Sequence, residues 1–366
     1  MPRTSTASAP GKLILAGEHA VVYGRPALVA AVDLRLTATL ARRDGRGERT
    51  VRIEVPQLGV AEEVAWEAVR EHARAARRRW EAWAAGSGES FSAVRGGDAA
   101  HVVKVALGEA ADHLGEPAPP SLDLAIRSEL PLGSGFGSSA AAAVTVVAGF
   151  CALLGRDPAP AEIEALAREV ERRQHGLPSG VDAATVLHGG VLWAERGPDG
   201  RLAIEPFPGR SPLLADLAVF DTGTPADSTG AVVAAVRERY AVERERIDPA
   251  WEAIEGATRE LRALLEEGVG GAEGRRRLVE LIRALEAGLE VLGIVPEPVR
   301  ELVRRVEAAG GAAKVSGAGT ITGEAAGSLL VAHPEPERVA EWGFLGGLVR
   351  HPVALGGAGL RVEVGD

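Results

Sequence analysis

The stretch PLGSGFGSSAAAAVTVV, residues 131–147, joins a turn rich in glycine and serine to a run of alanines and valines. It follows residues 121–130, whose alternating pattern predicts a strand. A strand that enters a glycine-rich turn and then a helix brings free backbone N–H groups to the helix start, where the helix dipole also favours negative charge. Taken alone, the stretch fits either a phosphate site or a flexible Gly/Ser linker.

Two common phosphate-binding patterns do not match this stretch. The lysine that follows the last glycine of a Walker A loop is absent, and no βαβ unit with a following acid surrounds the glycines. Ser138 and Ser139 begin the predicted helix, and their hydroxyls can bind phosphate oxygens or a metal ion. A linker would not normally lead directly into a strongly apolar helix, and this favours the anion site.

Composition limits the possible classes of protein. The 366 residues predict two domains, and 46% hydrophobic with 25% charged residues is typical of a globular chain. The net charge of −10 argues against a nucleic-acid binder, and no apolar run is long enough to cross a membrane. Residues 1–12 lack the apolar core of a signal peptide and predict a short disordered lead. The single cysteine, Cys151, excludes an internal disulfide and, among apolar neighbours, predicts a buried thiol.

Lysine is rare in this chain. Of 41 basic residues, only Lys12, Lys104 and Lys314 are lysines, and the others are arginines. Because the lysine ammonium is a compact charge, these three are weak pointers to places where such a charge is needed. For Lys104 no role is evident, and a solvated helix position is the default expectation.

Hydrophobic periodicity predicts strands and helices along the whole chain. Strands are expected at residues 12–16, 26–42, 51–55, 121–130, 189–195, 202–207, 214–223, 312–317, 328–333 and 360–364. Helices are expected at residues 60–85, 99–115, 138–154 and 160–174, in three long segments between 226 and 310, and near 334–342. The mixture predicts an α+β protein with a boundary near residue 210, giving domains 1–210 and 211–366.

Three other stretches carry residues suited to chemistry. In residues 9–35 a lysine opens a strand and the turn Gly-Glu-His follows, although a lysine at a strand end is usually just exposed. In residues 169–190 Glu171 lies near a helix end, and Asp182 follows a Pro-Ser-Gly turn, where an acid is more often a helix cap. Residues 314–333 form another glycine-rich turn between strands. Each stretch alone is moderate evidence.

Taken together, in this order and spacing, the stretches resemble the GHMP kinase family, named for galactokinase, homoserine kinase, mevalonate kinase and phosphomevalonate kinase. The resemblance spans nearly the whole chain. Within the family, KLILAGEHAVVYGRPAL (12–28), HGLPSGVD (175–182) and DTGTPADSTGAVVAAV (221–236) are most similar to mevalonate kinases. It implies a two-domain GHMP kinase fold, with an N-terminal mixed-sheet nucleotide-binding domain and a C-terminal ferredoxin-like α/β sandwich.

The activity that the resemblance implies is ATP-dependent phosphorylation of the 5-hydroxyl of mevalonate, a step of isoprenoid precursor synthesis, in the cytoplasm. By position, the ATP phosphates would lie on the loop residues Gly133, Ser134, Gly135, Gly137, Ser138 and Ser139. Ser139 and Glu171 match the family's Mg²⁺ ligands, in the usual arrangement of few protein oxygens with phosphate oxygens and water.

The reacting groups are also implied by position. Asp182 matches the catalytic aspartate, either a general base or an electrostatic group. Lys12 matches the lysine that contacts this aspartate and the substrate hydroxyl, where its charge would stabilise a developing alkoxide. The residues that match the substrate pocket are Lys12, Glu18, His19, Asp182 and Thr229.

The third family motif, at Gly317, Ala318 and Gly319, departs from the usual pattern. The glycine run that normally follows is replaced by TITGEAAGS (320–328), so we expect the local geometry to differ from that of the family. Two alternatives stay open: another kinase of this family acting on a related small alcohol, such as phosphomevalonate kinase, and a non-catalytic relative that senses metabolites. The family often forms dimers, so a homodimer is also open.

Overall fold

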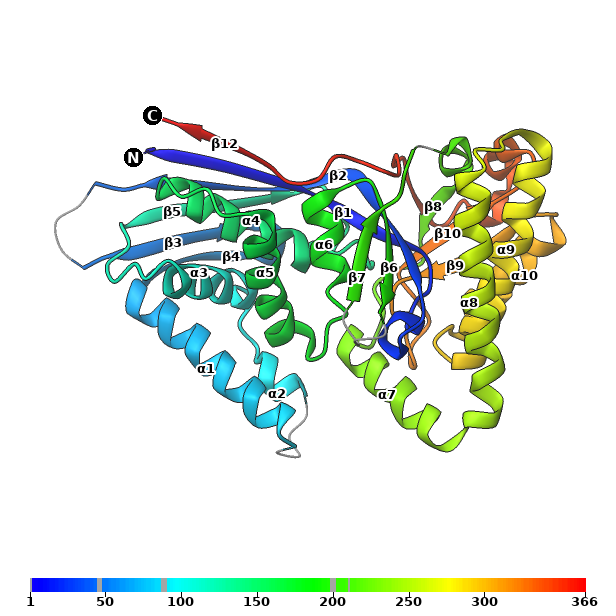
Figure 1. Ribbon diagram of the computed structural model, residues 1–366, viewed down its shortest axis with the longest axis horizontal. Helices are drawn as coiled ribbons and strands as arrows, with labels where there is room; N and C mark the ends of the chain where they lie inside the picture. The colour runs from blue at the N-terminus through cyan, green and yellow to red at the C-terminus, as the bar shows by residue number, and fades with distance from the viewer. Residues whose placement is uncertain (1, 45–47, 87–90, 198–201, 210) are drawn as a thin grey trace.

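The computed structural model describes residues 2–44, 48–86, 91–197, 202–209 and 211–366. Two sheets lie side by side, each with its own helices (Figure 1). Strands and helices are mixed in both halves, and the predicted α+β class is confirmed.

The first sheet runs in the order β12-β1-β2-β5-β3-β4, with β6 paired to β2 and β7 to β6. β3 and β5 are parallel and the other pairs antiparallel, so this sheet is mixed, as expected. Its strands are β1 (Thr4–Ala16), β2 (Ala27–Arg42), β3 (Thr50–Val55), β4 (Val60–Ala65), β5 (Leu122–Ser128), β6 (Val191–Arg196), β7 (Leu202–Pro206) and β12 (Arg361–Gly365).

Helix α4 (Ser138–Leu153) is the centre of the first half. Its residues from Ala140 to Cys151 are all buried, since it packs between β1 and β2 on one side and outer helices on the other. A Cβ atom at Gly149 would lie 2.7 Å from Cδ1 of Leu40, so glycine permits the close approach of helix and sheet. The surrounding helices are α1 (Trp66–Ala84), α2 (Phe91–Arg95), α3 (His101–His113), α5 (Pro160–His175) and α6 (Val181–His188).

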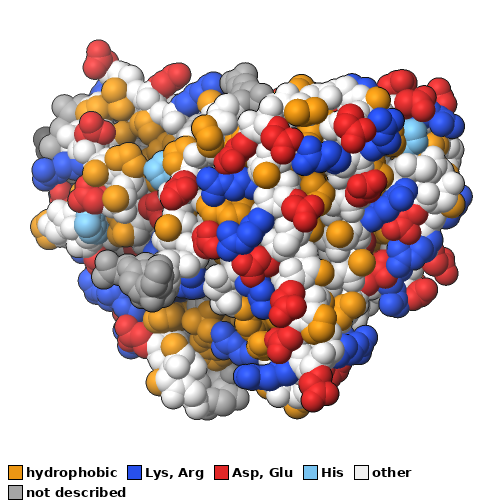
Figure 2. Space-filling view, turned by 45° about the vertical axis from the view of Figure 1, so that its right-hand side comes forward, with side chains coloured by type: hydrophobic (Ala, Val, Ile, Leu, Met, Phe, Trp, Pro, Cys, Tyr) orange, Lys and Arg blue, Asp and Glu red, His pale blue; other side chains and the backbone are white. Residues whose placement is uncertain are grey.

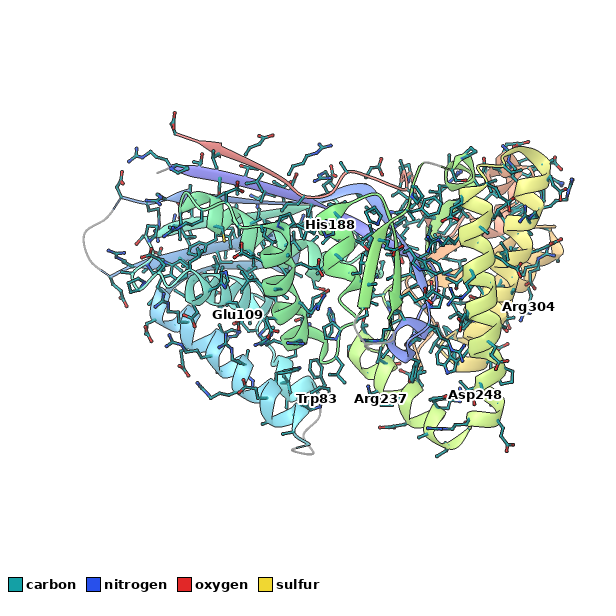
Figure 3. All side chains as sticks on the ribbon, in the orientation of Figure 1. Trp83, Glu109, His188, Arg237, Asp248 and Arg304 are labelled. Carbon is teal, nitrogen blue, oxygen red and sulfur yellow. The ribbon has the colours of Figure 1, made fainter. Side chains whose placement is uncertain are left out.

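A buried carboxylate holds the outer helices α1, α3 and α5 together. Glu109 of α3, labelled in Figure 3, lies against these helices. It accepts a hydrogen bond of 2.5 Å from Arg77 of α1 and lies 3.5 Å from the guanidinium of Arg173 of α5. Because Glu109 and Arg173 are both almost fully buried, the pairing compensates charges that would otherwise be costly to desolvate. This fixes α5, which carries Glu171.

The second sheet is antiparallel in the order β11-β8-β10-β9. Its strands are β8 (Ala218–Asp221), β9 (Ala312–Ser316), β10 (Ser328–Ala332) and β11 (Val349–His351), and its helices are α7 (Thr229–Val242), α8 (Arg244–Glu266), α9 (Gly271–Leu292) and α10 (Glu297–Ala308). α8 and α9 pack against each other, while α9 and α10 contact β9. The surface shown in Figure 2 intersperses basic and acidic side chains, consistent with ion pairs along α8 such as Arg259–Glu255.

The last strand returns to the first sheet. β12 pairs with β1, so the two chain ends lie side by side in Figure 1. Isolated bridges at Val32–Leu355 and Gly189–Ala358 attach the preceding segment to the first half. A division into 1–210 and 211–366 therefore remains a prediction, and β12 belongs to the sheet of the first half.

Several predicted elements were wrong. From Thr4 on, the expected disordered lead is part of β1, because small residues alternate there between β2 and β12. The predicted helix 60–85 begins six residues late, since residues 60–65 form β4 against β3. Residues 226–310 hold four helices rather than three, α6 was not predicted, and residues 334–342 contain a 3₁₀ helix, Pro336–Glu341.

Two single residues also test the sequence predictions. Cys151 is buried, as expected. The solvated position expected for Lys104 is wrong: its ammonium is buried 2.7 Å from Asp98 and 2.9 Å from Glu62. The periodicity of α3 alone could not show this pairing, because Glu62 lies on β4 and Asp98 precedes the helix.

A buried acid on α9 makes stability depend on pH. Burial raises the pKa of Glu286 to about 8, although its carboxylate accepts a hydrogen bond from the Val315 amide. Between about pH 4.5 and 8, Glu286 is protonated in the folded protein but ionised in the unfolded chain. The free energy of unfolding therefore falls as the pH rises through this range. Glu286→Gln should remove this loss, which amounts to ~3–5 kcal/mol.

The measurement is the unfolding midpoint of both proteins at pH 5.5 and 8.5. Glu286→Gln should gain stability relative to the parent at the higher pH only. The exposed Glu280→Gln on the same helix is the control. Parallel pH profiles for parent and Glu286→Gln would contradict the assignment.

Candidate functional site

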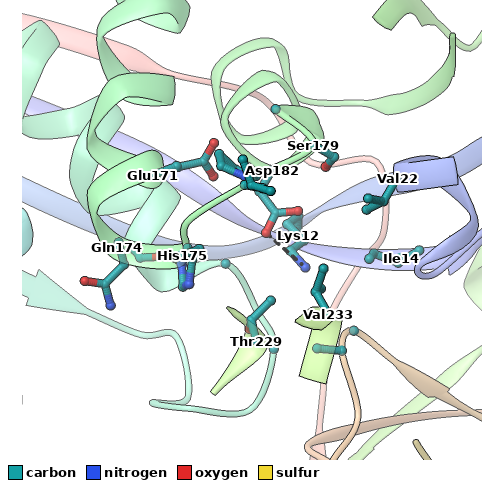
Figure 4. Close-up of a pocket in the computed structure, with 18 of the residues that line it drawn as sticks. Lys12, Ile14, Val22, Glu171, Gln174, His175, Ser179, Asp182, Thr229 and Val233 are labelled. Carbon is teal, nitrogen blue, oxygen red and sulfur yellow. Dashed lines mark hydrogen bonds and ion pairs between the residues drawn. The ribbon is translucent and has the colours of Figure 1, made fainter. Parts of the chain in front are cut away.

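A cavity of about 370 Å³ lies where the two halves meet. Its walls come from β1, the loop before α4, the end of α5, the start of α6, the start of α7 and the turn after β9 (Figure 4). The stretches that sequence analysis singled out therefore lie around one space, although they extend from Lys12 to Ala318 in the chain. The lining includes Lys12, His19, Glu171, Asp182, Thr229, Gly317 and Ala318.

The glycine-rich loop forms one wall and leads directly into α4. Gly133, Gly135 and Gly137 have φ values of 75°, 83° and 74°, which favour glycine. At Gly137 a Cβ atom would also lie 2.9 Å from Cγ of Lys12, so loop and lysine fit closely. Ser138 and Ser139 line the cavity as the first residues of α4, whose free N–H groups suit an anion.

Ser134 is placed differently from the rest of the predicted loop. It is buried and does not line the cavity, and its hydroxyl donates a hydrogen bond of 2.6 Å to Asp221 of β8. Its carbonyl accepts bonds from the amide and the hydroxyl of Ser328, at 3.1 and 2.6 Å. The side chain thus attaches the loop to the second sheet.

Lys12 and Asp182 form the charged pair at the cavity wall. The ammonium Nζ lies 3.3 Å from Oδ2 of Asp182, and the lysine is buried while the aspartate is 35% exposed to the cavity (Figure 4). Asp182 is the second residue of α6, whose cap position is Gly180, so it does not cap the helix. A buried ammonium beside a partly exposed carboxylate can stabilise negative charge on a third group.

Glu171 projects from α5 near Asp182. Burial, and then the negative charge of Asp182, raise the pKa of Glu171 well above its ordinary value, while Lys12 opposes the rise. Its Oε2 atom is buried and has no hydrogen-bond partner. Such a carboxylate needs a proton or a cation.

The unpartnered Glu171 oxygen bears on whether this cavity could bind Mg²⁺. Among the described residues, no cluster of three or more histidine, cysteine or acidic side chains could hold a metal unaided. Magnesium usually takes one or two carboxylates and completes its shell with phosphate oxygens and water. The unpartnered Oε2 of Glu171 and the cavity-lining hydroxyl of Ser139 fit that pattern.

Substrate-side residues differ in their placement. His19 and Thr229 line the cavity. His19, whose pKa is lowered by burial, lies with Nε2 2.9 Å from the carbonyl oxygen of Ala318. Glu18 does not line the cavity, because it is buried beneath it in an ion pair with Lys314.

The third motif also meets the cavity. Gly317 and Ala318 line it, whereas Gly319 (φ 67°) lies behind, where a Cβ atom would approach the Ile294 carbonyl oxygen to 2.3 Å. The atypical stretch that follows is organised by Asp227, whose Oδ2 accepts bonds from the amides of Ile321 and Thr322 at 2.9 and 2.7 Å. The hydroxyls of Thr320 and Thr322 bond the same oxygen.

Sequence reasoning did not single out His175, Arg95 or Gln174, which also line the cavity. Nε2 of His175 lies 2.9 Å from the Ser139 hydroxyl oxygen, and burial lowers the pKa of His175 to about 4. The available signal was spacing, since His175 follows Glu171 by one helical turn.

Comparison with known proteins adds to this geometry. Residues 100–190 match the model of the GHMP kinases N terminal domain. The chain is 31% identical to a mevalonate kinase of Pyrococcus abyssi over 328 residues, 87% of each chain. The chain belongs to the GHMP kinase family. This GHMP kinase is also 31% identical to a mevalonate kinase of Thermococcus onnurineus over 98% of both chains.

The fold of this GHMP kinase is likewise that of solved structures. It superposes on L. major mevalonate kinase in complex with R-mevalonate with a TM-score of 0.69 at 21% identity, covering 96% of both chains. At that identity the match shows the fold. No helix among the described residues is long and apolar enough to cross a membrane.

Removing the Asp227 carboxylate tests how the atypical stretch is held. Asp227→Ala should lower the stability of the 320–322 turn by ~1–2 kcal/mol, because two amides and two hydroxyls lose a charged acceptor. Hydrogen exchange of the Ile321 and Thr322 amides measures this directly. Glu324→Ala, an exposed acid in the same turn, is the control, and equal exchange in both variants would refute the role of Asp227.

Proposed function

We propose that this chain transfers the terminal phosphoryl group of ATP to the 5-hydroxyl of mevalonate, in the mevalonate pathway of isoprenoid synthesis. The observation that carries the proposal is the Lys12–Asp182 pair, which lies beside the glycine loop at the start of α4 and lines the same cavity. The choice of mevalonate as substrate is based on the similarity to mevalonate kinases at 31% identity.

The loop and the α4 terminus would bind the ATP phosphates. The amides at Ser138 and Ser139 offer donors, and the helix dipole adds favourable charge. Mg²⁺, held by Ser139 and Glu171, would neutralise phosphate charge when bound. The Ser134–Asp221 bond keeps the loop in place while the ligand exchanges.

Beside the loop, the charged pair acts on the alcohol. The 5-hydroxyl oxygen forms a new bond to the γ-phosphorus as the bond from that phosphorus to the bridging oxygen of ADP breaks. The hydroxyl proton passes to the Asp182 carboxylate, and the Lys12 ammonium stabilises the negative charge that develops on oxygen. His19 and Thr229 would hold the rest of mevalonate.

The decisive assay follows ADP release with mevalonate, phosphomevalonate, homoserine and galactose. Mevalonate should give the highest kcat/KM, with release abolished by chelation and restored by Mg²⁺. Highest activity on another alcohol would support a different kinase of the family. Folded protein that binds ATP but releases no ADP with any of them would support a metabolite sensor.

Asp182→Asn tests the proton acceptor. The amide keeps the shape but cannot take the proton, so kcat should fall by ~10²–10⁴ with ATP affinity nearly unchanged. Single-turnover ADP formation and equilibrium nucleotide binding measure the two quantities. Asp157→Asn, exposed after α4, is the control. A kcat within threefold of the parent would remove Asp182 from the mechanism.

We also propose a cytoplasmic homodimer, paired through the edge strand β12. Val362 and Val364 are exposed there. If the β12 strands of two copies paired antiparallel with Val362 opposite Val362, Arg361 of each copy would lie opposite Glu363 of the other, giving two ion pairs. Light scattering should give a dimer mass, Arg361→Glu should dissociate it, and Arg361→Glu with Glu363→Arg should restore it. A monomeric parent, or no effect of the single exchange, would contradict this interface.

A further inference from the structure

We infer that His175 is a positioning residue, which accepts a hydrogen bond from the Ser139 hydroxyl and so turns the free lone pairs of that oxygen toward Glu171 and the metal. The inference rests on the proposed function, since it concerns the cation that accompanies ATP. Its test measures cation and nucleotide binding without mevalonate.

The geometry brings three side chains together from two helices. Ser139 stands in the first turn of α4, and its hydroxyl oxygen lies 2.9 Å from Nε2 of His175. His175 is the last residue of α5, one turn beyond Glu171, so both face the cavity from the same helix (Figure 4). The imidazole bound to the serine oxygen and the unpartnered Glu171 oxygen thus come from the same helix.

The direction of this hydrogen bond decides what Ser139 can do. If Nε2 carried the hydrogen, the imidazole would donate to the serine oxygen and use one of the two lone pairs that could bind a cation. If Nε2 accepts, the hydroxyl hydrogen points at the imidazole and both lone pairs stay free for a cation. Without such an acceptor the hydroxyl would donate to a carboxylate, using an oxygen that the cation needs. Partners of this kind orient metal ligands and tune their affinity.

The surroundings hold the backbone at His175 in place. Trp80 of α1 donates a hydrogen bond of 2.8 Å from its indole nitrogen to the carbonyl of Gly176, directly after His175. A Cβ atom at Gly230, near the start of α7, would lie 3.0 Å from the His175 carbonyl oxygen, so α7 packs closely against this end of α5. The α5 end is therefore fixed between two other helices.

The experiment uses His175→Leu, which removes the acceptor, and His175→Gln, whose amide oxygen can replace it. Calorimetry compares ADP binding with Mg²⁺ and without it. In His175→Leu, Mg²⁺-dependent binding should weaken ~10-fold while metal-free ADP binding stays within twofold. His175→Gln should recover most of the loss, and thermal unfolding checks that each variant is folded.

A double-mutant cycle with Ser139→Ala completes the test. In the Ser139→Ala background, His175→Leu should have no further effect on Mg²⁺-dependent binding, because the group it orients is gone. Additive effects, equal loss of metal-free ADP binding, or failure of glutamine to rescue would each overturn the inference. If Mg²⁺–ADP binding behaves as expected but mevalonate is not phosphorylated, the proposed substrate fails and the role of His175 stands.

Discussion

A buried ammonium within β1 sets the conditions for the rest of this structure. Lys12 is almost fully removed from water, so its charge needs a nearby anion, and Asp182 supplies it at 3.3 Å. Its methylene chain covers Gly137, and its amide donates to the Phe136 carbonyl. The glycine loop, β1 and α6 are consequently held in one arrangement.

The other two lysines follow the same rule. Lys314 pairs with Glu18 beneath the cavity, and Lys104 lies between Asp98 and Glu62 at the foot of α3. In a chain that otherwise uses arginine, all three lysines are buried and paired. The Lys314 pair joins the turn after β1 to β9, and the Ser134–Asp221 bond joins the loop to β8. Buried polar contacts thus connect the two sheets around the cavity.

Much of the fold and of the candidate site could be predicted from the sequence, because these features depend on local sequence patterns. The strand, glycine turn and apolar helix of residues 121–154 were visible as such, and resemblance brought Lys12, Glu171 and Asp182 into one site. What could not be predicted depends on distant partners. The start of β1 becomes a strand only because β2 and β12 flank it. Glu18 points away from the cavity because it pairs with Lys314. The turn after Gly319 is held by the Asp227 carboxylate instead of being formed by a run of glycines.

The return of β12 to the first sheet has a mechanical consequence. The chain passes between the sheets twice, once after β7 and once after β11, and the second passage is attached to the first half at Val32 and Gly189. Two passages restrict relative twisting of the halves more than a single connection would. Wide opening of the cavity would also have to break the buried polar contacts that join the two sheets.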